Sequence, residues 1–357
     1  MTGFGSNSGQ MPPRSCSPPR RRNILAAAAN GVGRFIARWG GDADRVLGRA
    51  GIDADTVLHP KAALDLGRYV TMMELAAAET GNDNFGLWYG QEFTPEMLGL
   101  IGEIAIASPT LGSAVENLAL LFPYHQHATE TRLRVEGDLL HLEYRILDGQ
   151  IVERRQDAEL TMGMYANVFR HCLGQSWEPE EVFFEHPTPE GWRDHEQAFR
   201  APIHFGQRTN ALVFRDKDLG RPMPKADLTR LVRLREELLR IAGGTGQPSF
   251  LNRIQGEIRS RLPEGNPHIE DVAQSLGQAR WTLQRRLSDQ GLSFSDLVDG
   301  VRRDLARLHL RQRHIPVADI GFILGYSEVS AFSRACRRWF GTSPQKIRQS
   351  DVVSTGR

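Results

Sequence analysis

The stretch IEDVAQSLG at residues 269–277, followed by ARWTLQRRL at 279–287, has the spacing of a helix–turn–helix unit. A second copy follows as VADIGFILG at 317–325 and EVSAFSRACRRWF at 328–340. The copies match at an offset of 48 residues in the first helix and 49 in the second, so one residue is added in the second turn. Two such units this close together are typical of a protein that contacts two neighbouring stretches of DNA.

Each copy separates residues that build a small core from residues that stay exposed. Small residues at Ala273 and Gly321 let the second helix cross close by, and Gly277 and Gly325 suit the left-handed backbone that ends a helix. Apolar residues at helical spacing face inward: Ile269, Val272, Leu276, Leu283 and Leu287 in the first copy, and Val317, Ile320, Leu324, Phe332 and Cys336 in the second.

The second helix of each copy, which we call its recognition helix, leaves polar side chains exposed. Arg can pair with guanine, Gln with adenine, and an aromatic side chain can pack on the methyl group of thymine. We therefore predict base contacts from Arg280, Trp281, Gln284 and Arg285 in the first copy and from Val329, Ser330, Ser333 and Arg334 in the second. We expect most base recognition from the first copy, because the acidic Glu328 stands beside the second recognition helix. The alternative is an ordinary solvated surface, because Arg and Gln are good helix formers anywhere.

A long helix is predicted between the two copies, with Ser293 as its N-cap. Phe294, Leu297, Val301, Leu305 and Leu308 form an apolar stripe at helical period. A rigid connector would fix the distance between the recognition helices, and adjacent major-groove faces recur every ~34 Å along DNA. Basic residues that flank the recognition helices are candidate phosphate contacts: Arg302, Arg303, Arg307, Arg311, Arg337, Arg338, Lys346 and Arg348.

Charge is divided unevenly along the chain. The 357 residues, of which 40% are hydrophobic, are enough for two domains. Residues 251–350 contain 16 Lys+Arg and 10 Asp+Glu, whereas residues 23–250 contain 23 and 32, although the net charge of the whole chain is only +1. A basic domain on an acidic body favours a nucleic-acid partner.

Several classes of site are not predicted. Cys16, Cys172 and Cys336 are widely scattered, which fits a reducing cytoplasm and gives neither a disulfide framework nor a zinc motif. No apolar run approaches the roughly 20 residues that span a bilayer, so no membrane partner is expected. No glycine-rich phosphate loop, nucleophile elbow or paired-carboxylate signature appears, so we expect no cofactor, no metal and no enzyme activity.

The patterns predict an α+β body, helix-rich with a few strands, followed by an all-α domain. We divide the chain into a disordered tail at 1–22, a body at 23–242, a linker at 243–248, a C-terminal domain at 249–350 and a disordered tail at 351–357. Helices are predicted at 24–39, 43–50, 66–80, 111–121, 154–173, 192–199 and 227–241. A hairpin is predicted at 131–146, and short strands at 181–185, 203–205 and 211–214.

About 100 C-terminal residues resemble the AraC/XylS transcription regulators. The resemblance is carried by LQRRL at 283–287, SFSDLVDGVRRDLARLHL at 293–310 and ADIGFILGYSEVSAFSRACRRWFGTSPQKIR at 318–348. It implies seven helices with two helix–turn–helix motifs, and base contacts from Trp281, Gln284, Arg285, Val329, Ser330 and Arg334. Two departures stand out. Ala279 replaces the usual capping Ser or Thr, at a cost of about 1 kcal/mol, and Cys336 replaces a bulkier aromatic residue.

The body resembles the amino-terminal effector domain of the AraC subgroup related to the ornithine-utilisation regulator, over roughly residues 30–240. The matching stretches are FGLWYG at 85–90, LGLIGEIAIASPTLGSAVENL at 98–118, FRAPIHFGQRTNALVF at 199–214 and RPMPKAD at 221–227. Such domains bind a small molecule and mediate dimerisation. The resemblance therefore implies a cytoplasmic, sequence-specific regulator: a homodimer and an activator that binds promoter DNA, responds to an effector and contacts RNA polymerase.

Polar and aromatic residues of the body are candidates for the effector pocket. They are Tyr124, His125, His127, Tyr144 and Tyr165. A competing interpretation takes the two histidines with Glu130 as metal ligands, because two imidazoles and a carboxylate can bind zinc or iron, but it requires this stretch to be extended. Two alternative functions stay open: an enzyme held on DNA by its C-terminal domain, and a ligand-independent architectural protein.

Overall fold

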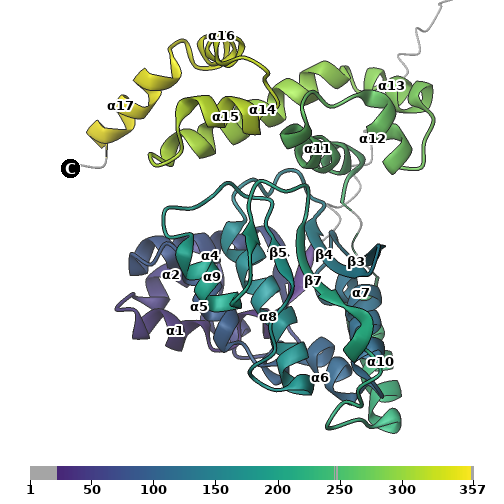
Figure 1. The fold of residues 1–357 in the computed structure, drawn as a ribbon. Helices are drawn as coiled ribbons and strands as arrows, with labels where there is room; N and C mark the ends of the chain where they lie inside the picture. The colour runs from purple at the N-terminus through teal and green to yellow at the C-terminus, as the bar shows by residue number, and fades with distance from the viewer. Residues whose placement is uncertain (1–21, 245, 247, 355–357) are drawn as a thin grey trace, which may run out of the picture.

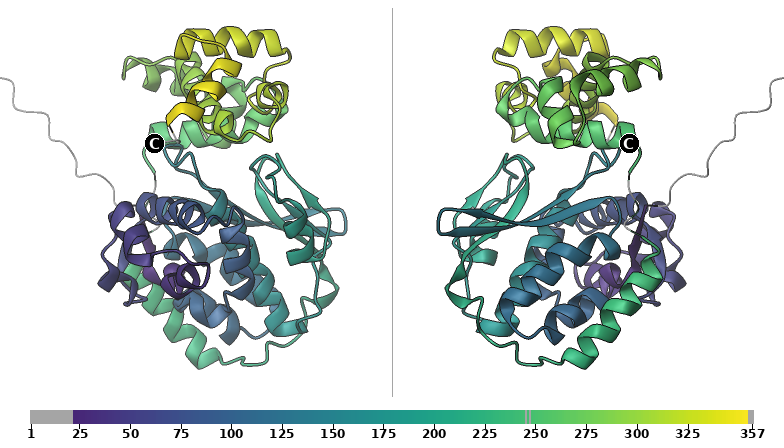
Figure 2. Two further views of the ribbon diagram at one scale, coloured as in Figure 1. Left: turned by 90° about the vertical axis from the view of Figure 1, so that its left-hand side faces the viewer. Right: turned by 90° about the vertical axis from the view of Figure 1, so that its right-hand side faces the viewer.

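The computed structural model describes residues 22–244, 246 and 248–354, and shows two bodies stacked on one another (Figures 1 and 2). Each body has its own core of buried hydrophobic residues, drawn from residues 24–238 in the first and from residues 254–336 in the second. Of the predicted tails at 1–22 and 351–357, residues 1–21 and 355–357 lie outside the described residues, as do Thr245 and Gln247 of the predicted linker. Residues 351–354 of the predicted C-terminal tail are helical.

The N-terminal body combines helices with one main sheet, as predicted. Its α-helices are α1 (Val32–Arg38), α2 (Ala43–Ala50), α3 (Ala54–Val57), α4 (Leu66–Thr80), α5 (Phe85–Glu92), α6 (Leu100–Ala107), α7 (Leu111–His125), α8 (Arg155–Leu173), α9 (Arg193–Phe199) and α10 (Leu228–Ala242). Its 3-10 turns are η1 (Ala26–Ala29), η2 (Pro95–Leu98) and η3 (Asp216–Asp218). Its strands are β1 (Asn23–Leu25), β2 (Ala63–Asp65), β3 (Thr129–Glu136), β4 (Leu139–Ile146), β5 (Glu181–Phe183), β6 (Ile203–His204) and β7 (Asn210–Arg215).

The main sheet has the strand order β3-β4-β7-β5-β6, in which only β5 and β6 run parallel. The predicted hairpin is confirmed as β3 and β4, with Leu133 opposite Leu142. Gly137 in its turn has φ 63°, a left-handed conformation that favours glycine. Strands β1 and β2 form a separate two-stranded sheet.

Two predicted helix limits were wrong. The segment 24–39 is not one helix but β1, η1 and α1. Its start pairs with β2 as a strand, and Gly31, with φ 84°, separates η1 from α1. Helix α7 begins after Thr110, whose hydroxyl accepts a hydrogen bond from the Ser113 amide as an N-cap, but it continues to His125 instead of ending near 121. The stretch that contains Tyr124 and His125 is therefore helical and not extended.

The C-terminal body contains seven α-helices among the described residues, as the family resemblance implies. They are α11 (Phe250–Arg261), α12 (Ile269–Ser275), α13 (Arg280–Ser288), α14 (Phe294–Arg311), α15 (Val317–Ile323), α16 (Val329–Phe340) and α17 (Pro344–Ser354), with a 3-10 turn η4 (Leu262–Glu264) after α11. Gly277 and Gly325 have φ 65° and 76°, and a Cβ atom at Gly325 would lie 2.3 Å from the Gly265 carbonyl oxygen. Only glycine therefore fits the second turn.

The long connector is helix α14. Ser293 and Asp296 form a reciprocal capping box at its start, and Leu297, Val301 and Leu305 are buried along one side. The helix thus joins the α12–α13 unit to the α15–α16 unit through one hydrophobic core.

Candidate nucleic-acid interface and interdomain cavity

The first recognition helix, α13, presents its predicted base-contacting side chains to solvent. Leu283 and Leu287 are buried, and this turns Trp281 outward with 68% of its surface exposed. Gln284 and Arg285 are exposed on the same helix, and within the described part of the chain the side chain of Arg285 has no hydrogen-bond or ion-pair partner. Arg280 is held by Glu270, with 2.8 Å between Nη1 and Oε1.

The second recognition helix, α16, carries a more self-contained polar surface. The Ser330 hydroxyl donates to Glu328 Oε2 at 2.9 Å, and Arg334 Nη1 lies 3.5 Å from the same hydroxyl. Val329 is exposed and Ser333 is partly buried. Because these groups already contact one another, the helix offers fewer free donors and acceptors than α13.

The candidate phosphate contacts fall into two groups. Six are exposed: Arg303, Arg307, Arg311, Arg337, Arg338 and Lys346. Arg302 instead donates to the Leu324 and Gly325 carbonyl oxygens at 2.8 and 3.3 Å, and Arg348 donates to the Gln312 and Ile315 carbonyls. These last two side chains support the turns of the fold, which leaves the exposed group as the better candidates.

The aromatic effector candidates lie in the core of the N-terminal body. The rings of Tyr144 and Tyr165 both meet Phe122 edge-on, at centroid distances of 5.8 and 5.5 Å. The Tyr144 hydroxyl donates to Asp157 Oδ2 at 2.5 Å, and burial raises the pKa of Asp157 to about 6. The Tyr165 hydroxyl lies 3.1 Å from Thr131 Oγ1. Both tyrosine hydroxyls are therefore already bonded inside the protein.

The histidine candidates do not form the metal group that the sequence allowed. His125 is buried at the end of α7, where burial lowers its pKa to about 3, and Glu130 is paired with Arg145 at 2.7 Å. His127 Nδ1 lies 3.4 Å from the Asn23 amide nitrogen. Tyr124 is partly buried against the main hydrophobic cluster.

A cavity of about 390 Å³ lies between the two bodies. The N-terminal body lines it with the end of α4, the start of α8 and the residues after β5, among them Ala78, Arg154 and His186. The C-terminal body lines it with Arg259 of α11 and with Leu308, His309 and Gln312 in and after α14. The cavity was not predicted from the sequence, because its lining residues come from segments that are far apart.

Arg259 is the most unusual charge in this cavity. Its Nη1 donates to the carbonyl oxygens of Ile151 and Val152 at 3.2 and 2.6 Å. Burial and the neighbouring Arg154 lower its pKa to about 9. Arg154 is paired with Glu185 at 2.6 Å, whereas Arg259 makes no ion pair among the described residues. Arg259 is half-buried, and its guanidinium offers N–H donors to a ligand that carries an acceptor group.

Close polar contacts fasten the two bodies at one side of the cavity. Arg145 Nη2 lies 2.7 Å from Glu257 Oε1, and Asn252 Nδ2 donates to Asp148 Oδ1 at 2.7 Å. We call these four residues the interdomain latch. All four have mostly buried side chains, and Figure 1 shows α11, which carries Asn252 and Glu257, lying against the N-terminal body.

Both bodies match known protein families. Residues 40–223 match the family model described as the arabinose-binding domain of AraC transcription regulator, N-terminal, and residues 272–350 match a helix-turn-helix domain. The HTH-type transcriptional regulator VirS of Mycobacterium tuberculosis is 28% identical over 302 residues, which cover 82% of this chain and 86% of that protein. The ornithine utilization regulator of Pseudomonas aeruginosa is 24% identical over 339 residues, which cover 92% of this chain and 96% of that protein.

Solved structures also match. The crystal structure of the transcriptional regulator CdpR from Pseudomonas aeruginosa covers 88% of this chain and 98% of its own, at 22% sequence identity and a TM-score of 0.40. Among the helices that the structure describes, none is both long and apolar enough to cross a membrane.

Proposed function

Because this chain belongs to the AraC family of DNA-binding transcription regulators, and is not an enzyme, we propose that it activates promoters when a small molecule binds in the cavity between its two bodies. The observation that carries the proposal is that α11 and α14 of the DNA-binding domain form one wall of that cavity. A ligand there touches both the N-terminal ligand-binding domain and the domain that contacts DNA. We place the boundary between the domains at the linker 243–248.

The DNA contacts are proposed for the exposed recognition helices. Trp281, Gln284 and Arg285 of α13 are free to reach base edges in a major groove, and α14 sets where α16 meets the next stretch of DNA. Arg311 and the other exposed basic side chains supply phosphate contacts, which position the domain without reporting sequence.

Regulation follows from the shared wall of the cavity. A ligand that contacts both domains binds with a free energy that depends on their relative placement, so it shifts the population toward the arrangement it fits best. We propose that this ligand carries a hydrogen-bond acceptor or an anionic group directed at Arg259, whose guanidinium makes no ion pair among the described residues.

A thermal-shift screen of metabolites tests the location of the effector. Compounds that raise the melting temperature of the wild-type protein are retested on Ala78→Trp, which fills the cavity from an exposed position on α4. Ala37→Trp, an exposed position on α1, is the matched control. We expect the shift to vanish only in Ala78→Trp. A compound that stabilises both variants equally would place the effector site elsewhere, and a screen without any hit would favour a ligand-independent regulator.

We propose a homodimer that contacts RNA polymerase, on the support of the family resemblance alone. Sedimentation of the purified protein with and without operator DNA tests the dimer. Transcription from a bound promoter with purified polymerase tests activation, and a fall in transcript on adding the protein would make it a repressor.

A further inference from the structure

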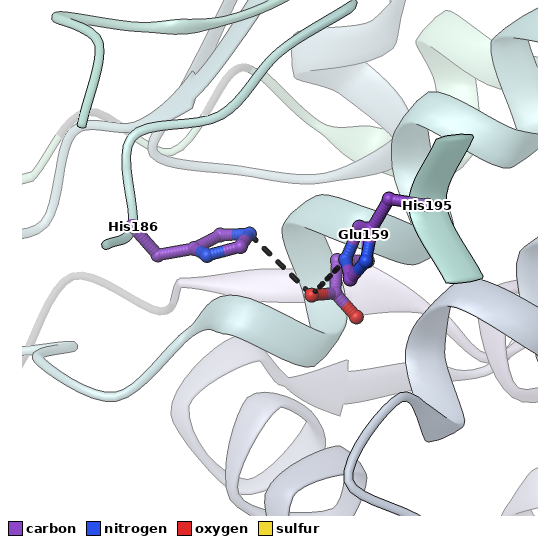
Figure 3. Close-up of side chains that lie close together, drawn as sticks. All are labelled: Glu159, His186 and His195. Atoms are coloured by element: carbon purple, nitrogen blue, oxygen red, sulfur yellow. Dashed lines mark hydrogen bonds and ion pairs between the residues drawn. The ribbon is translucent and has the colours of Figure 1, made fainter. Parts of the chain in front are cut away.

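We infer that Glu159, His186 and His195 form a binding site for a divalent transition metal ion of the zinc or iron(II) type. The three residues come from α8, from the segment after β5 and from α9, and Figure 3 shows them converging on one carboxylate oxygen. The inference stands on the geometry of these side chains and does not depend on the proposed effector site.

The ligand atoms have the right chemistry and nearly the right spacing. One atom from each residue lies within 4.8 Å of the others, and Glu159 Oε1 is 3.4 Å from His186 Nε2 and 2.8 Å from His195 Nε2. Ligands about 2.0–2.1 Å from a tetrahedral ion lie roughly 3.3 Å apart. The first distance already fits. At the second, His195 Nε2–H donates to Glu159 Oε1, so an ion can bind only if this hydrogen bond opens by about 0.5 Å and the proton moves to His195 Nδ1, which has no hydrogen-bond partner among the described residues. Two imidazoles and one carboxylate form a ligand set that zinc and iron(II) accept.

Polar atoms at the site lack the partners that burial normally requires. Glu159 and His195 are fully buried and the His186 side chain is only 10% exposed, yet Glu159 Oε2 and His186 Nε2 have no hydrogen-bond partner. Most buried polar atoms are hydrogen-bonded, so a buried polar atom without a partner needs an explanation. An ion bound between the three side chains would explain these unpartnered atoms.

The orientation of His186 is set from outside the group. Its Nδ1 lies 2.9 Å from the Pro187 carbonyl oxygen, so that nitrogen carries the proton and the lone pair of Nε2 points toward Glu159. A metal-binding histidine commonly has this second contact, which fixes the tautomer and the ring.

Arg155 is the charge that opposes a cation here. Its Nη1 lies 3.7 Å from Glu159 Oε1, but its guanidinium is also paired with Asp83 at 2.7 Å. The carboxylates of Glu159 and Asp83 carry two negative charges and the Arg155 guanidinium carries one positive charge. The remaining negative charge favours a bound dication. We therefore expect weaker binding than at a structural zinc site with thiolate ligands, which carries more negative charge.

The site joins three elements, one of which reaches the DNA-binding domain. Two residues after His186, the Thr188 carbonyl oxygen lies 2.9 Å from His314 Nε2. An ion at Glu159 would fasten this segment to α8 and thereby fix one of its contacts with the C-terminal domain.

The test is Co²⁺ titration of the full-length, tag-free protein after treatment with a chelator, followed by competition with Zn²⁺. We expect one ion per chain with a tetrahedral or five-coordinate visible spectrum, and at least a tenfold loss of affinity in His186→Ala and in His195→Ala. His204→Ala, a half-exposed histidine that pairs with Glu181, is the control and should bind as the wild type does.

A second measurement separates lost binding from lost folding. Zn²⁺ should raise the melting temperature of the wild type and of His204→Ala, but not that of a folded His186→Ala or of the conservative Glu159→Gln. The inference is overturned if the wild type shows neither a stoichiometric spectrum nor a shift. It is equally overturned if the ligand variants bind Co²⁺ as tightly as the wild type, because the ion would then lie elsewhere.

Discussion

The interdomain latch predicts a measurable coupling free energy between Arg145 and Glu257. The Arg145 side chain is 16% exposed and that of Glu257 6%, and their charged atoms are 2.7 Å apart. The coupling should therefore exceed that of a surface ion pair, which is worth about 0.2–1 kcal/mol. It should fall short of the roughly 3–5 kcal/mol lost when a fully buried pair is broken, because Glu257 keeps Arg261 and Ser275 as partners. We expect about 1.5–2 kcal/mol.

The assay is a double-mutant cycle of Arg145→Gln and Glu257→Gln, measured as free energies of unfolding in denaturant. The matched control is the cycle for Arg38 and Glu92, which lie at the same distance of 2.7 Å but with side chains 58% and 49% exposed. That pair should couple by less than 1 kcal/mol. A latch coupling no larger than that of the control pair would refute the reasoning, because the two domains would then not be docked in solution.

Three further predictions concern single substitutions. Arg285→Ala and Arg334→Ala should each cost about 1–3 kcal/mol of DNA-binding free energy and relax the preference at one base position, with the larger effect at Arg285. Arg311→Ala should instead weaken binding to matched and scrambled sites alike, and reduce the slope of log affinity against log salt concentration by about one. Identical behaviour of all three in binding titrations would remove the base-contacting role. Ala279→Ser should stabilise the DNA-binding domain by about 1 kcal/mol in thermal unfolding, because the N-cap of α13 makes no side-chain hydrogen bond. Burial lowers the pKa of His309 to about 4, so between that pH and about 6.5 the unfolded state binds more protons than the folded state. The free energy of unfolding therefore falls as the pH drops through this window. His309→Gln should reduce that fall by at most about 3 kcal/mol, and parallel pH–stability curves for the variant and the wild type would contradict this.

Local patterns were enough to predict most of the fold. The duplicated unit has apolar residues at helical spacing and glycines at both turns, and the structure places Leu283, Leu287, Phe332 and Cys336 in one core. The prediction of one helix at 24–39 was wrong because a run of four alanines has no polar side that defines a helix period. The pairing of β1 with β2 determines the conformation at the start of this segment.

Local sequence patterns did not predict the candidate sites in the N-terminal body. His125 and His127 attracted a metal interpretation because they are close in sequence, yet they do not converge with Glu130. The group that does converge spans 27 residues from Glu159 to His186 and nine more to His195. Its members are brought together only when α9 places His195 Nε2 2.8 Å from Glu159 of α8, and no spacing rule in one sequence encodes that contact.

The bonding of Arg259 indicates the direction in which an effector would act. Only its Nη1 is engaged, by the Ile151 and Val152 carbonyl oxygens, and among the described residues its other guanidinium nitrogens make no hydrogen bond. A ligand that accepts from those nitrogens adds a contact to α11 without replacing one that holds the domains together. Binding should therefore strengthen the docked arrangement, and the effector should act by fixing the DNA-binding domain in one orientation instead of releasing it. A cavity ligand that increased the distance between the domains in solution scattering would contradict this direction.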